Sequence, residues 1–187
     1  MRLSSPPTPA VSTARLASLG ATLLLATALA GCSKPAPAPP PAPAPVPMAQ
    51  MDPVPTARAC AKPEEKEAFD VTGLKTRLMV AALACGEEDK YNAFIKRNRP
   101  VLVTQDAKLT NYFNRAYGRG KQGQTEMDSY KTELANVQQQ RRSRDAAFCQ
   151  VSNALFGEAL AAKSPADIGP LASSAPIDQP LMVSTCN

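Results

Sequence analysis

Cysteine is the residue type in this sequence that could do the most chemistry, and its spacing restricts what that chemistry is. Of the 187 residues, five are cysteine and none is histidine. Catalytic dithiols and zinc knuckles need cysteines a few residues apart, whereas the nearest two, Cys60 and Cys85, are 25 positions apart. The lack of histidine also excludes histidine metal sites and the usual base that activates serine or cysteine nucleophiles. The sequence therefore predicts structural cysteines, no metal and no cofactor.

Two acidic clusters are the remaining candidates for catalysis. Glu64, Glu65 and Glu67 form one cluster, and residues 87–89 form the other. Each cluster also suits the N-terminus of a helix, and neither shows the pair of carboxylates that glycosidases use. No glycine-rich phosphate loop and no G-x-S-x-G motif is present. We therefore expect a non-enzymatic protein, with a carboxylate-dependent enzyme as the alternative.

Basic residues gather in the segment 96–144, which holds eleven lysines and arginines but only four acidic residues. On a helix, Lys108, Arg115 and Arg119 project onto one narrow stripe beside the apolar face. A charged stripe of this kind is usually a solvated face. The alternative is a surface for an anionic partner. Nucleic acid is not the expected partner, because the segment has no recognition motif and no dense interleaving of aromatic residues.

The elements that would position these residues are helices. Apolar residues recur every three or four positions in five segments, and no alternating strand pattern appears. These segments are 74–85, 87–99, 102–116, 127–137 and 148–159. Pro100 separates the second segment from the third, and Thr125 is a candidate cap for the fourth. The pattern predicts an all-α fold, a small bundle of about five helical segments.

Proline divides the chain into regions. Residues 35–47 alternate proline with alanine, which excludes helix and sheet and favours extended polyproline II. The linker of residues 32–58 is therefore expected to be a stalk, although a proline-rich recognition ligand is the alternative. Prolines are rare across residues 59–163, the expected helical domain, and return in residues 164–187, the expected C-terminal tail.

The first 31 residues have the order of a secretory signal. Arg2 and Arg15 precede an apolar stretch that ends in small residues, and a start near Val11 would give a more compact signal. Leu29-Ala30-Gly31-Cys32 resembles the lipobox of bacterial lipoproteins. The resemblance implies cleavage before Cys32, attachment of fatty acyl chains such as palmitate at that residue, and membrane anchoring. The alternative is a signal for soluble secretion.

The residue after the lipobox cysteine bears on localisation. In this family an aspartate there resembles an inner-membrane retention signal, whereas this chain has Ser33. The resemblance therefore implies anchoring in the outer membrane, most simply on its periplasmic face.

Lipidation of Cys32 would leave four cysteines in an oxidising compartment, an even number that suits disulfides. Four cysteines allow three connectivities. The simplest pairs Cys85 with Cys149 inside the bundle, and Cys60 with Cys186 at its two ends. We expect these pairs to staple the domain.

Short motifs within the domain resemble those of small helical envelope proteins of proteobacteria. The motifs are Ala84-Cys85-Gly86, Tyr91-Asn92, Tyr112-Phe113, Tyr117-Gly118 and Phe148-Cys149. The resemblance supports the fold and the inner disulfide and implies no activity. We expect a binding or scaffolding lipoprotein whose partners are the membrane and an anionic envelope component or protein. The alternative is an enzyme that acts on cell-envelope polymers.

Overall fold

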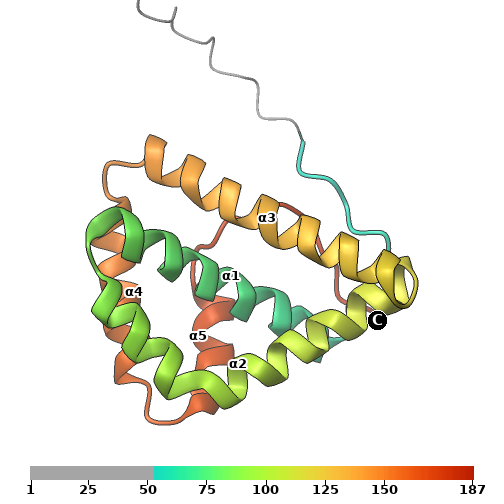
Figure 1. The fold of residues 1–187 in the computed structure, drawn as a ribbon, viewed down its shortest axis with the longest axis horizontal. Helices are drawn as coiled ribbons and strands as arrows, with labels where there is room; N and C mark the ends of the chain where they lie inside the picture. The colour runs from blue at the N-terminus through green and yellow to red at the C-terminus, as the bar shows by residue number, and fades with distance from the viewer. Residues whose placement is uncertain (1–52) are drawn as a thin grey trace, which may run out of the picture. The chain divides into compact units, whose positions relative to one another are not determined.

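Residues 53–187 of the chain are described by a computed structural model, and five α-helices run through them (Figure 1). The helices are α1 (Pro63–Cys85), α2 (Glu88–Tyr117), α3 (Lys121–Arg144), α4 (Phe148–Ala161) and α5 (Ile168–Ser174), with a short 3₁₀ turn, η1 (Pro165–Asp167), before α5. The described part contains no β-strand, only two isolated parallel bridges. The predicted all-α fold is confirmed. The expected signal peptide, Cys32 and the Pro/Ala run lie outside the described residues.

Helix α1 is the centre of the bundle, because it contacts all four other α-helices (Figure 1). It begins with Pro63, whose fixed φ suits the first helical position. Its third residue, Glu65, accepts a hydrogen bond from the Lys62 amide nitrogen (2.8 Å), one of the donors that a helix start leaves free. The helix ends at Gly86, which adopts a left-handed φ of 74°.

The expected break at Pro100 is wrong, because helix α2 continues through this residue. The two predicted segments 87–99 and 102–116 form one helix, and Pro100 lies inside it. A proline in a helix removes one backbone hydrogen bond and bends the axis, and α2 does change direction partway along its length (Figure 1). Buried residues on both sides of the proline hold the two halves against the bundle, among them Phe94 and Leu109. Tertiary packing therefore outweighs the local cost of the proline.

Two hydrophobic clusters form the core, and α1 contributes to both. Leu74 and Leu78 of α1 pack in the first cluster with residues of α2, α4 and α5. Phe69 belongs to the second, where its ring meets Tyr112 of α2 and Tyr130 of α3 edge to face, with centroids 4.8 and 5.1 Å away. Such pairs add a specific geometry to the burial of apolar area.

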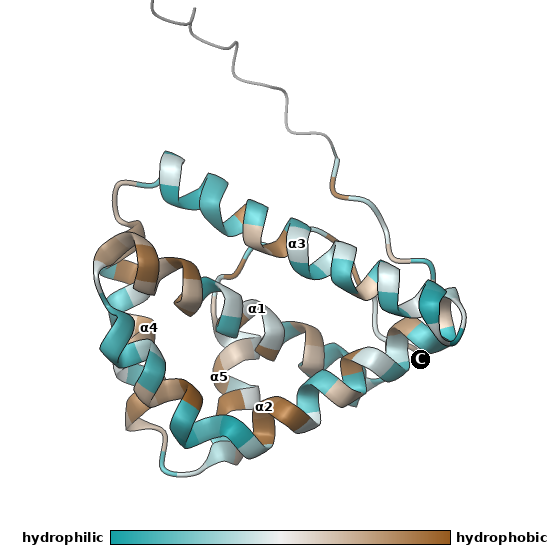
Figure 2. Cartoon of the chain, viewed as in Figure 1, coloured by the Kyte–Doolittle hydropathy of each residue, from teal (hydrophilic) through white to brown (hydrophobic). Residues whose placement is uncertain are grey.

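Helix α3 is mostly hydrophilic (Figure 2) and packs on the bundle through one stripe of buried residues. Its buried side includes Met127, Tyr130 and Leu134, as the spacing predicts, followed by Gln138. The helix begins at Lys121 after Gly120, so the expected cap at Thr125 is wrong. Gly120 has a φ of 75°, which glycine adopts without strain and which allows the tight turn out of α2.

The C-terminal region differs from the expected tail. Residues 164–187 contribute α5, whose Ile168 and Ala172 are buried in the first core cluster. The following residues return along the bundle to the point where the chain enters it, at the two bridges Thr56–Met182 and Ala61–Thr185. The folded domain therefore extends beyond the predicted boundary at residue 163 and includes the C-terminal segment.

Candidate binding surface

Two disulfides join the cysteines in the predicted pairs. Cys60 is bonded to Cys186 with 5.0 Å between their Cα atoms, and Cys85 to Cys149 with 5.8 Å. Both distances fall in the usual range of about 4.4–6.8 Å. The inner bond joins the end of α1 to the start of α4, and Cys149 is exposed rather than inside the domain as expected.

The outer disulfide lies within a clip that joins the two ends of the domain. The Ala57 amide donates to the Met182 carbonyl oxygen (2.8 Å), and the Cys186 amide donates to that of Ala61 (2.8 Å). Tyr112 of α2 donates its hydroxyl to the Ala59 carbonyl oxygen (2.7 Å). The segment that connects the linker to the helices is therefore fixed to the C-terminus and to α2 before α1 begins.

The basic stripe does not form as one helical surface. Lys108 and Arg115 lie on α2, but Arg119 lies in the turn before α3. The Arg115 guanidinium bonds to the carboxylate of Glu65, to the Cys60 carbonyl oxygen (2.9 Å), and lies over the Tyr112 ring. A guanidinium engaged in this way is less available to a partner. Arg115 therefore braces the start of α1 and Arg119 lies off the helix, while binding of an anionic partner by this surface stays a prediction.

The hydrogen-bond partners of Glu65 explain why this buried carboxylate stays ionised. Burial raises the pKa of Glu65, but the hydrogen bonds from Arg115 and the Lys62 amide outweigh burial and hold the pKa below its ordinary value. Glu65 is 5% exposed, so its charge is kept by these partners and not by water.

The acidic clusters have structural partners. Glu65 is used as above, Glu67 accepts a hydrogen bond from Gln105, and Glu87 pairs with Lys90 (2.7 Å) at the start of α2. Within residues 53–187, no group of three or more cysteine or carboxylate side chains is arranged to hold a metal ion.

Arg77 is a buried cation that the sequence analysis did not single out. It is 3% exposed, its Nε donates to the Ser152 hydroxyl (3.0 Å), and its guanidinium lies 3.8 Å from the centre of the Phe148 ring. Gln138 accepts from its Nη1 (3.5 Å) and donates to the Asp178 carbonyl oxygen (2.7 Å). Arg77 thus joins α1, α3, α4 and the C-terminal segment.

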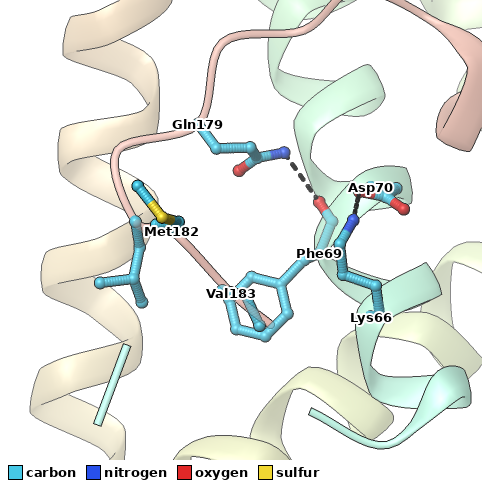
Figure 3. A pocket seen from close by; sticks show the side chains of 7 residues that line it. Lys66, Phe69, Asp70, Gln179, Met182 and Val183 are labelled. Carbon is cyan, nitrogen blue, oxygen red and sulfur yellow. Dashed lines mark hydrogen bonds and ion pairs between the residues drawn. The ribbon is translucent and has the colours of Figure 1, made fainter. Parts of the chain in front are cut away.

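A hollow of about 210 Å³ lies between α1 and the C-terminal segment (Figure 3). Met182 and Val183 line one side and Phe69 the other, and Gln179 donates to the Phe69 carbonyl oxygen (3.4 Å). Its charged residues, Lys66 and Asp70, pair with each other. The hollow therefore offers a small apolar surface with no charge left for a ligand.

A second hollow, of about 320 Å³, lies between α1 and α2 beside Pro100. Lys75 of α1 and Arg99 of α2 line it together with apolar side chains of α2. Sequence reasoning missed this site because Lys75 and Arg99 are 24 positions apart, and only the α1–α2 packing brings them together. Of the surfaces described, this one best combines cationic and apolar side chains.

Comparison with known proteins finds no relative of this chain. No protein-family model, curated protein or solved structure matches the chain. In the part of the chain that the structure describes, no helix is long and apolar enough to span a bilayer.

Proposed function

We propose that this protein is a lipoprotein anchored in the outer membrane, which holds a stapled helical domain in the periplasm for a non-enzymatic binding or scaffolding role. The observation that carries the proposal is Leu29-Ala30-Gly31-Cys32 at the end of a basic and then apolar leader. The proline-alanine run that follows suits a spacer between a lipid and a domain.

The domain has features that suit this role. Two disulfides among the four remaining cysteines are what an oxidising compartment favours. The clip at Cys60–Cys186 holds the segment through which a lipid anchor would attach. Force applied to the linker would therefore be transmitted to the C-terminal segment and α2 as well as to α1. A rigid domain on a tether is suited to presenting a surface to a partner.

Membrane fractionation of variants at the lipobox tests the proposal. Cys32→Ala should remove the protein from the outer-membrane fraction and leave it without acyl mass, because no other thiol is placed to receive the lipid. Ser33→Asp should keep it in membranes but shift it towards the inner membrane in an enteric host, and Ser33→Ala should leave it in place. A Cys32→Ala protein that still fractionates with the outer membrane would contradict the anchor.

A further inference from the structure

The hollow between α1 and α2 has an unbalanced charge. Lys75 and Arg99 form no ion pair with another described residue, although both line the hollow. The one acidic residue in the lining, Asp106, is paired with Lys131 of α3 (2.7 Å). The charge of Asp106 is thus largely balanced by Lys131, and the two cations beside it have no carboxylate of their own.

The floor of the same hollow is apolar. Ile95 and Leu102 are half-buried where they pack against the first core cluster, and Val103 is 63% exposed. These residues follow one side of α2 for about 12 Å, at 1.5 Å per residue from position 95 to 103. Val103 is thus an exposed apolar side chain that lines the hollow together with two cations that have no ion-pair partner.

We propose that this hollow binds an amphiphile with an anionic head group and a single alkyl chain. The head group, a carboxylate or phosphate, accepts hydrogen bonds from Lys75 and Arg99. The chain lies along Ile95, Leu102 and Val103. This inference rests on the binding role proposed above, and it does not depend on the lipid at Cys32.

The size of the hollow favours a small molecule over a macromolecule. Its volume of about 320 Å³ is at the lower end of the range of ligand pockets, about 300–1,000 Å³. A stable protein interface covers about 800 Å² on each side, so a protein partner would have to extend well beyond the six lining residues. An acidic protein segment is therefore an outcome for the test to exclude.

The test uses the chain from Met48 to Asn187, a compact unit that contains both core clusters and both disulfides. Laurate, kept below its critical micelle concentration, is the probe for calorimetric titration and for amide chemical shifts. We expect saturable binding, with the largest shifts around Ile95, Leu102 and Val103. Acetate lacks the chain and dodecyltrimethylammonium has the opposite charge, so both should bind at least about tenfold more weakly.

Two double variants distinguish binding in the hollow between α1 and α2 from general attraction between the anionic probe and a basic protein. Lys75→Gln with Arg99→Gln should weaken laurate binding at least about tenfold, because two charge-assisted hydrogen bonds are lost. Lys121→Gln with Arg142→Gln removes the same charge from exposed positions of α3 and should leave the affinity unchanged. Thermal unfolding checks that both variants fold.

The proposal would be overturned by a lack of saturable laurate binding, by equal weakening in the control variant, or by shifts centred on the Met182 hollow. Binding to polyglutamate or to anionic vesicles without binding of monomeric laurate would also overturn it. None of these results bears on the anchor, which the fractionation of Cys32→Ala tests separately.

Discussion

At the scale of single residues, Arg77 carries a positive charge in the core without a carboxylate in contact. Burial and the nearby Arg141 lower its pKa, while Asp145 and Asp178 act in the opposite direction from farther away. Its direct partners are neutral, namely Ser152, Gln138 and the face of Phe148. A guanidinium stays charged at all ordinary pH values, so the cost of burying it is met by hydrogen bonds and the aromatic face.

Arg77→Met should lower the free energy of unfolding by about 1–3 kcal/mol. Methionine fills part of the volume, but it leaves the Gln138 carbonyl oxygen and the Ser152 hydroxyl without a donor. Urea unfolding monitored by circular dichroism measures the change. Arg142→Met, on the exposed side of α3, is the control and should stay within about 0.5 kcal/mol of the wild type. Equal stability of the two variants would show that the buried contacts of Arg77 contribute nothing.

Glu65 should make stability depend on pH on the acidic side. Because its pKa is lowered in the folded state, its contribution is fully present above the ordinary value of 4.5 and is lost as the pH falls through the folded pKa. Glu65→Gln should therefore flatten the decline of stability below about pH 4.5. Unfolding curves from pH 7 to pH 3 test this. Glu64→Gln, a neighbouring exposed residue, should keep the slope of the wild type.

At the scale of elements, the sequence was informative where a pattern is local. The spacing that includes Leu74 and Leu78 predicted the second half of α1, and that of Met127, Tyr130 and Leu134 predicted the middle of α3. The starts of both helices, at Pro63 and Lys121, were not predicted. The glycine at position 118 follows the last residue of α2. Helix periodicity is visible without knowing the fold because one face of each helix must be apolar.

The elements that were missed depend on contacts across the fold. Pro100 signals a break locally, yet α2 continues because residues on both sides of it pack on the bundle. The seven-residue α5 is too short to be stable alone, and its Ile168 is buried only because α1 lies beside it. The disulfide pairing could be predicted from the count and positions of the cysteines, whereas the Lys75–Arg99 hollow could not be predicted from any spacing.

Two glycines in helical regions should respond to alanine with opposite signs. Gly86 ends α1 at a φ of +74°, so Gly86→Ala should cost about 1–2 kcal/mol. Gly157 lies inside α4 with open space around its Cα, so Gly157→Ala should add about 0.5–1 kcal/mol. Thermal unfolding of both variants against the wild type is the measurement. A stabilised Gly86→Ala protein would contradict the assigned end of α1.

At the scale of the whole molecule, two covalent links close long loops. The outer disulfide spans 126 positions of sequence and the inner one 64. Restricting the unfolded chain in this way stabilises the folded state, and the gain grows slowly with loop length. The outer link also joins the segment that precedes α1 to the C-terminal segment.

Replacing either cysteine pair by serine should lower the free energy of unfolding by about 2–4 kcal/mol. Loss of Cys60–Cys186 should cost about 0.6 kcal/mol more than loss of Cys85–Cys149, because the closed loop is about twice as long. Urea unfolding of the two double variants measures both values. Wild-type protein in a reducing agent should be less stable than either variant. A reduced protein as stable as the oxidised one would contradict a stabilising role for the links.

The lipid anchor is the central claim, and the mass of the mature N-terminus tests it most directly. Protein extracted from bacterial envelopes should begin at Cys32 and carry the added mass of a diacylglycerol, with a further acyl chain where the new amine is modified. Fragmentation should place all of the added mass on Cys32. A mature chain that begins at another residue, or one in which Cys32 keeps a free and unmodified thiol, would contradict the account.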